Sequence, residues 1–381
     1  MKKDLVFVIT VTLAVIILAI IDTGFENPQL TQNTIYEKAE ILKTDNSALQ
    51  EISVVVVGNQ KVKIKLLSGK FKGQEFDAEN ILNGQKNIDK IFKTGDKVLA
   101  VVTLDNNGNV IGVRAAEFYR TGIELFLAIL FVAALIGFAG VTGLKAVLSF
   151  MFTALSFWKI LLPLYLKGIS PIPAGIILSF VTSTVVILLV AGVNKKGFSA
   201  LSGASLGIAF TALLSLVSAQ WFKIPGTVQD YSEALIYSGF NLNLSQIFIA
   251  SIFISASGAL MDVSTDIAAA IDEIHRRMPQ LPGKELVISG FKIARPVIGS
   301  MTTTLLFAYS SGFLFAFMAF MAKGMPLTMI INSNYIAAEI FHTLTGSLGL
   351  VLTAPLTAIA AGIIYSRGKL KIENGQLKIK N

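Results

Sequence analysis

The sequence has no cysteine and only two histidines among its 381 residues. Disulfides, thiolate nucleophiles, iron–sulfur clusters and cysteine-ligated zinc are therefore excluded. Charged residues are also scarce, at 15%, whereas 53% of the residues are hydrophobic. Soluble domains carry about 25% charged residues, and disordered chains have too few apolar residues to resemble this composition. The composition predicts an integral membrane protein.

An excess of basic residues is the second compositional signal. Lys and Arg total 32 against 24 Asp and Glu, a net charge of +8. A basic chain can bind nucleic acid, but these Lys and Arg residues lie beside apolar stretches, where membrane orientation and anionic lipid explain them. We expect anionic lipids at the cytoplasmic face as partners, no nucleic acid and no cofactor.

Eight apolar stretches approach the roughly 20 residues that a helix needs to cross a bilayer. The first follows two lysines and lacks the small-residue pattern of a cleavage site, so we interpret it as an uncleaved signal anchor; a signal peptide is the alternative. The stretches lie at about Leu5–Ile21, Ile123–Gly140, Ala146–Leu166, Ala174–Val193, Phe198–Ala219, Ile247–Thr265, Val297–Met321 and Gly346–Tyr365.

The distribution of Lys and Arg over the short loops predicts the orientation. If all eight stretches cross, the short loops on one side receive only Lys167, Lys223 and Lys323. We therefore expect both termini in the cytoplasm and a multi-pass protein of a bacterial cell membrane. The other side receives Lys2, Lys3, Lys145, Lys195, Lys196, Arg276, Arg277, Lys284, Arg367, Lys369, Lys371, Lys378 and Lys380.

The insertion after the first stretch has the alternating pattern of β-strands. Ile52–Val57 and Val62–Leu67 flank Gly58–Gln60, which predicts a hairpin, and Val98–Leu104 with Val110–Ala116 predict a second one around a loop rich in Asn and Gly. A five-stranded barrel of the OB type fits the length, with a sandwich as the alternative.

Lysines alternate with apolar residues in one of these strands, at Lys61, Lys63 and Lys65. This alternation predicts one solvent-exposed face. An anionic polymer is a less favoured occupant, because few aromatic residues stand among the lysines. Ser68–Gln74 has the composition of a loop into a further strand.

The sixth stretch carries polar residues on one helical face. Ser251, Ser255, Asp262, Asp266 and Glu273 are spaced by four or seven residues, which places them within a wedge of roughly 60°. A carboxylate facing lipid is costly, so this face must meet protein or water. The competing interpretation is a packing seam whose acids mark the cytoplasmic end.

The seventh stretch carries a matching seam at Lys292, Gly299, Thr303 and Ser310, flanked by Arg295. Because this stretch returns outward, its cations lie at a depth similar to that of the two aspartates. The sequence therefore predicts an ion-paired polar site at the cytoplasmic side. Its members are Asp262, Asp266, Arg295, Thr303, Ser255 and Lys292.

Lys159 is a further charge inside an apolar stretch. If it is buried, Glu124 and Glu339 are the acids at a compatible depth; if it is not, it reaches toward the outer interface. Glu339 also precedes His342 by three residues, but a lone Glu-x-x-His is weak evidence for a metal. No zinc motif, Walker A loop or nucleophile elbow is present, so we do not expect an enzyme.

Several segments carry a family resemblance. They are Ser257–Val263 continuing to Ile274, Gly290–Arg295, Met301 with Leu305–Tyr309, and Gly346–Leu352 ahead of Pro355–Thr357. In these the chain resembles the YibE/F family of bacterial multi-pass membrane proteins. The resemblance implies an N-terminal anchor, an external β-rich segment and a membrane domain.

The predicted fold is an α-helical polytopic membrane protein of about eight transmembrane helices, with an extracytoplasmic OB-like barrel between the first two. The predicted domains are a signal-anchor helix at 1–21, the β domain at 22–119, a seven-helix membrane domain at 120–366 and a basic cytoplasmic tail at 367–381. We hypothesise a secondary transporter or ion-coupled permease for a small ion or solute. The rival is a receptor or scaffold whose β domain binds an envelope partner.

Overall fold

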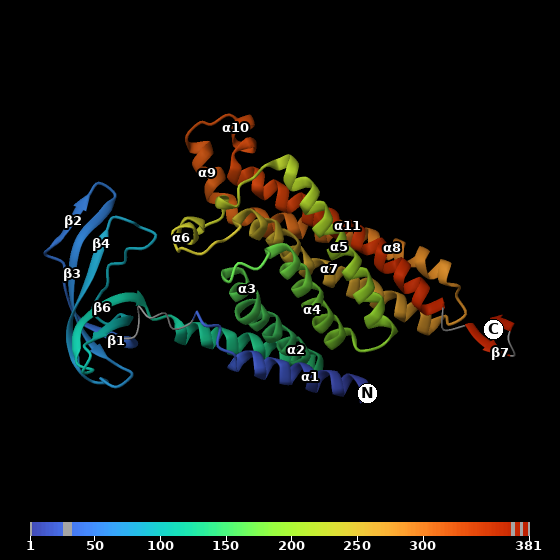
Figure 1. Cartoon of the computed structure of the whole chain (residues 1–381), viewed down its shortest axis with the longest axis horizontal. Helices are drawn as coiled ribbons and strands as arrows, with labels where there is room; N and C mark the ends of the chain where they lie inside the picture. Colours follow the sequence, from blue (N-terminus) through green and yellow to red (C-terminus); the bar gives the residue numbers. More distant parts are fainter. Residues whose placement is uncertain (1, 26–32, 367–369, 374–375, 380–381) are drawn as a thin grey trace. The chain divides into compact units, whose positions relative to one another are not determined.

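The computed structural model describes residues 2–25, 33–366, 370–373 and 376–379. Contacts divide the chain into two compact units: residues 24–135, and residues 1–23 with 136–381. The first unit contains a β-barrel and the second a bundle of long helices, both traced by sequence colour in Figure 1.

In the described part of the chain, seven helices are long and apolar enough to cross a membrane. The long helices are α1 (Lys2–Ile20), α2 (Thr121–Ser156), α4 (Pro171–Ala191), α5 (Lys195–Phe222), α7 (Leu244–Arg277), α8 (Gly283–Ser310) and α11 (Asn334–Ser366). The short ones are the π-turn η2 (Phe157–Leu161), α3 (Leu162–Leu166), η3 (Gly226–Val228), α6 (Ser232–Ile236), η4 (Ser311–Phe313), α9 (Leu314–Ala322) and α10 (Leu327–Asn332).

The second and third predicted spans belong to one helical stretch. Residues Thr121–Leu166 form a 46-residue apolar element with no loop inside, about 69 Å at 1.5 Å per residue and thus over twice the hydrocarbon thickness. Gly140 interrupts it with φ 54° and ψ −128°, a conformation that a residue with a side chain rarely adopts. The element therefore has two span-length segments that meet at Gly140, where the sequence predicted a separate loop.

Five strands close into a barrel of OB topology. In sheet order they run β1-β5-β6-β4-β3, and β1 also pairs with β3. β4 and β6 are parallel, and the other pairs are antiparallel. The strands are β1 (Thr34–Asp45), β2 (Leu49–Ile52), β3 (Val55–Leu66), β4 (Glu75–Asn83), β5 (Lys97–Leu104) and β6 (Val110–Phe118), with a short hairpin of β7 (Leu370–Glu373) and β8 (Gln376–Ile379) near the C-terminus.

The first predicted hairpin is wrong, because β3 runs without a turn through Gly58–Gln60. The turn lies instead at Ser53, whose φ is 55°. Gly58 is the point where β3 leaves β2, and a Cβ there would lie 2.2 Å from the carbonyl oxygen of Ala48. The second hairpin is confirmed: β5 and β6 pair across a loop in which Asp105 accepts backbone N–H bonds from Asn107 and Asn109.

Gln60 holds a loop across one end of the barrel. Its buried side chain donates to the Phe92 carbonyl (2.8 Å) and accepts from the Phe92 N–H (3.0 Å) and from Asn80 (2.9 Å). These bonds fix Phe92, 1% exposed, edge-on against Phe118. Gln60, which the sequence pattern assigns to a turn, is thus part of the barrel core. This role explains why the hairpin predicted at Gly58–Gln60 is wrong.

Helices α5 and α11 pack closely side by side, as Figure 1 shows. At three levels a glycine of one helix faces a threonine of the other, and a Cβ on each glycine would lie 1.9 Å from the threonine Oγ1. Small residues permit this approach of two backbones within a membrane. The contacts are Gly203 with Thr357, Gly207 with Thr353 and Gly349 with Thr211.

Candidate functional site

The polar face predicted for α7 exists, but its part at Asp262 and Asp266 points away from the bundle. Leu260, Val263 and Ile267 form the opposite, fully buried face of the helix. Asp262 and Asp266 are both exposed at the surface of the helical unit. The periodicity therefore identified a shared face for the two aspartates, and the packing of α7 turns this part of the face outward.

The seam of α8 is exposed in the same way. Leu286, Gly290 and Ala294 pack inward, whereas Lys292, Arg295, Gly299 and Thr303 are exposed on the far side of the helix. Among the described residues no ion pair joins these cations to Asp262 or Asp266. The structure does not bring the predicted charge pairs together within one chain.

A different polar junction forms where α7, α8 and α11 meet. The Oγ of Ser255 on α7 lies 2.6 Å from Nε2 of His342 on α11. Ser255 also donates to the Ile252 carbonyl (3.0 Å), so Nε2 of His342 is the donor and Ser255 the acceptor between them. The ring of Tyr309 on α8 stacks on the His342 ring with centroids 4.4 Å apart.

Glu339 is the carboxylate of this junction, one helical turn before His342. It is only 6% exposed, and Oε1 accepts a hydrogen bond from Thr343 at 3.2 Å. The Tyr309 hydroxyl is buried beside Ser255 without a hydrogen bond of good geometry. Two protonatable side chains and an unsatisfied hydroxyl thus share one region inside helices that are long enough to span a membrane.

Gly346 of α11 lies where the three helices meet. A Cβ on Gly346 would make ordinary van der Waals contacts of 3.5 Å with Ala256 and with the Tyr309 ring. Tyr309 lies in the last turn of α8, directly before the 3-10 turn η4. An ionisable site at the end of an interrupted membrane helix is a recurrent arrangement in transporters.

Lys159 lies in the π-turn η2 and is half-buried. Glu339, one of the two acids predicted to pair with it, accepts a hydrogen bond from Thr343 on its own helix. Glu124 is exposed and belongs to the other compact unit. π-turns interrupt the regular hydrogen bonding of a helix and are frequent at functional positions.

An open cavity of about 560 Å³ lies at the start of α7. Polar side chains line it, including Ser170, Asn241 and Asn243. Its α7 lining ends at Ile247, and helical spacing places Ser251 and Ser255 on the same face in the next two turns. The cavity therefore lies at the start of the α7 face that carries Ser255 about two turns further along.

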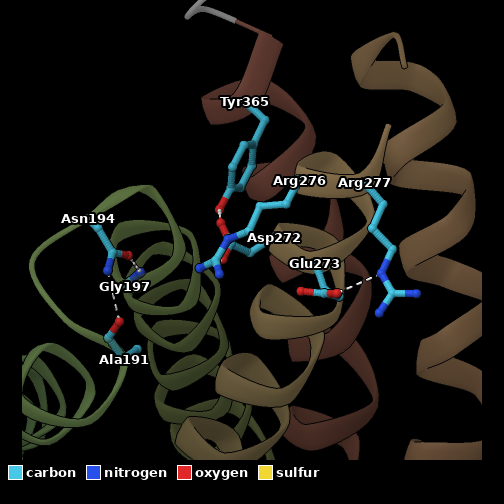
Figure 2. Close-up of polar contacts among 8 residues, drawn as sticks. All are labelled: Ala191, Asn194, Gly197, Asp272, Glu273, Arg276, Arg277 and Tyr365. Atoms are coloured by element: carbon cyan, nitrogen blue, oxygen red, sulfur yellow. Dashed lines mark hydrogen bonds and ion pairs between the residues drawn. The ribbon is translucent and has the colours of Figure 1, made fainter. Parts of the chain in front are cut away.

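The opposite end of the bundle collects the basic residues. Figure 2 shows Asp272 accepting bonds from the Tyr365 hydroxyl (2.5 Å) and from Arg276 (2.5 Å). Lys195 lies over the Tyr365 ring, 5.5 Å from its centroid. These contacts bring the ends of α7 and α11 to the start of α5.

Two further contacts bring α1 and α8 to this end. Asp4 of α1 accepts a hydrogen bond from the Val193 N–H (2.9 Å), directly before α5. A Cβ on Gly283, the first residue of α8, would lie 2.7 Å from the Gly362 carbonyl oxygen. The basic residues predicted to share one side of the membrane therefore share one end of the bundle, apart from the side chains beyond Ser366, which lie outside the description.

No group of three His, Asp or Glu side chains in the described ranges is placed to hold a metal ion. From the sequence alone, Ser255 and Glu339 fall in separate predicted sites, His342 enters only through the Glu-x-x-His metal motif, and Tyr309 belongs to no predicted site. The signal in the sequence is the Glu-x-x-His spacing on an apolar helix.

Long apolar helices with buried ionisable groups, preceded by an OB-type barrel, define a polytopic membrane protein with a separate β domain. Residues 127–367 match the family described as YibE/F-like protein, and residues 34–114 match the YibE/F family N-terminal domain. The chain belongs to the YibE/F family. No curated protein and no solved structure matches it significantly.

Proposed function

We propose that this protein is an ion-coupled permease, with the junction of Ser255, Tyr309, Glu339 and His342 as its ion or proton site. The observation that carries the proposal is the buried Glu339 carboxylate one turn from a hydrogen-bonded imidazole, inside a membrane helix. Burial of such groups in a membrane is costly, and they mark ion pathways and proton relays more often than structural contacts.

The chemistry of the junction suits proton exchange. An imidazole carries one donor and one acceptor when neutral and two donors when charged. His342 can take up a proton at Nδ1 and release one from Nε2 toward Ser255, and Glu339 adds a carboxyl group on the same helix face. The open cavity at the start of α7 lies about two helical turns before Ser255 along the same helix.

Ion flux into proteoliposomes tests the proposal. Imposed gradients of H⁺, Na⁺ and K⁺ would be followed with fluorescent indicators for the wild type, Glu339→Gln and Glu233→Gln. Glu233 is an exposed acid of the short helix α6, so its amide variant is the matched control. We expect flux in the wild type and the control and its loss in Glu339→Gln; flux equal in all three proteins contradicts the proposal.

A second candidate function is favoured by the surface of the β domain. Ile52, Val54 and Ile88 expose 55%, 72% and 56% of their surface, and a groove of about 340 Å³ runs between Val54 and Ile91. Exposed apolar patches of this kind mark partner-binding surfaces. A receptor or scaffold would keep its partner when Glu339 is changed and lose it with Val54→Asp, as measured by co-purification from cross-linked membranes.

A further inference from the structure

Two charged faces of the bundle have no counterpart within the chain. The acidic face consists of Gly258, Asp262 and Asp266 on α7, and the basic face of Lys292, Arg295 and Gly299 on α8; both are exposed. None of their four charges has an ion-pair partner in the described ranges. Both helices belong to membrane-spanning stretches, where a charge facing lipid is unfavourable. Protein or water, and not lipid, therefore covers these faces.

The two faces lie at the same depth. The helices are antiparallel neighbours joined by residues 278–282, and a Cβ on Gly290 would lie 2.8 Å from Cδ1 of Ile271, so these residues are level. Five residues back from Ile271 is Asp266, and five residues on from Gly290 is Arg295. The acidic and basic faces are therefore level to within about one helical turn.

Within one chain the two faces cannot meet, because each is opposite the core side of its own helix. Val263 and Ile267 of α7 and Ala294 of α8 fill the space between the helices and α11. A two-fold axis along the bundle keeps every residue of a second copy at its own depth. It also sets α7 of one copy antiparallel to α8 of the other, which is the geometry of a self-complementary interface.

The spacing along the two faces fits this arrangement. Read in opposite directions, Gly258, Asp262 and Asp266 match Gly299, Arg295 and Lys292, so each acid meets a cation and glycine meets glycine. Neither glycine has an atom within 4 Å of an added Cβ, which leaves both backbones open to close approach by another helix.

We propose that a second copy of this chain covers the acidic and basic faces, with Asp262 and Asp266 of each copy paired to Arg295 and Lys292 of the other. The resulting dimer contains two identical interfaces about one axis. The proposal stands independently of transport, since it rests on charge, depth and exposure alone.

Cysteine cross-linking tests the arrangement cleanly, because the chain has no cysteine of its own. Gly258→Cys and Gly299→Cys would be placed in two differently tagged copies and co-expressed. Mild oxidation of membranes should link the two tags into one dimer band. The control replaces Gly258→Cys with Leu213→Cys, a residue of α5 that is 60% exposed; equal linking of the control pair overturns the proposal.

Charge exchange between copies is the second test. Asp262→Arg alone and Arg295→Asp alone each place like charges at both interfaces, so the dimer fraction in detergent should fall roughly tenfold or more for each. Co-expression of the two single variants restores one opposite pair at each interface, and the mixed dimer should recover.

Pairing within one chain predicts a different pattern, in which only the double variant in a single copy recovers. That result overturns the proposal, as does a wild type that is monomeric both in membranes and in detergent. If the charge variants fail to fold, the cross-linking result decides, because both cysteines replace glycines with open surroundings.

Discussion

The contact between Gly207 and Thr353 predicts a specific pattern of damage and rescue. An alanine at 207 would place its Cβ 1.9 Å from Oγ1 and 3.0 Å from Cβ of Thr353. Overpacking of a close-packed core typically costs about 1 to 3 kcal/mol, and the better helix propensity of alanine returns up to about 1 kcal/mol. We expect Gly207→Ala to lower the free energy of unfolding by about 1 to 2 kcal/mol.

Removing the clashing oxygen should recover part of that loss. In Gly207→Ala with Thr353→Ala the closest remaining atom is Cβ of residue 353, which has to shift by a few tenths of an ångström. The equivalent pair at Gly203 should not recover, because Cβ and Cα of Thr357 remain at 2.6 and 2.7 Å. The two sites are thus matched tests of the same packing.

Unfolding by SDS titration in mixed micelles, followed by Trp fluorescence, measures these differences. Gly137→Ala is the control, because no atom lies within 4 Å of its added Cβ, and it should be neutral or slightly stabilising. If Gly207→Ala unfolds with the wild type, or if the Gly203 pair recovers as fully as the Gly207 pair, α5 and α11 are not packed as described.

Three other predictions follow from the ends of the bundle and from the barrel. A reporter after Lys284 should be cytoplasmic and one inserted within Asn106–Gly108 external, which tests the orientation. Tyr365→Phe removes one of the two bonds to Asp272 and should lower the unfolding free energy by about 0.5 to 1.5 kcal/mol, measured by the same SDS titration. The hydrogen bond from the Lys90 ammonium holds the pKa of Glu117 below its usual range. The ionised Glu117 should therefore stabilise the folded barrel above the usual carboxylate pKa range, and this stabilisation should be lost as the pH falls through the lowered pKa. Hydrogen exchange of β6, corrected for intrinsic rates, should show this acid loss in the wild type and a weaker one in Glu117→Gln.

The barrel shows how far alternation along a strand can be trusted. Val62, Ile64 and Leu66 are buried while the lysines between them are exposed, as period-two alternation predicts. The error at Gly58–Gln60 arose because Gly, Asn and Gln have turn composition. Only the folded barrel shows that Gln60 bonds to a loop 32 residues away.

The membrane helices show a different limit. Helical spacing placed Asp262 and Asp266 on one face correctly, but it carries no information on whether that face points into the bundle or out of it. The direction depends on which neighbours pack against Val263 and Ile267, a property of the tertiary fold. The contact of Ser255 with His342 joins residues 87 positions apart, so no local sequence pattern predicts it.

Charge movement on a solid-supported membrane tests the central claim, that the Glu339 junction moves an ion. Jumps in pH or in Na⁺ concentration would be applied to membranes carrying the wild type, Glu339→Gln or Glu233→Gln. We predict a transient current for the wild type and for Glu233→Gln with at least one of these ions, and no current for Glu339→Gln at equal folded protein. A current of wild-type size from Glu339→Gln, or none from the wild type, would contradict the account.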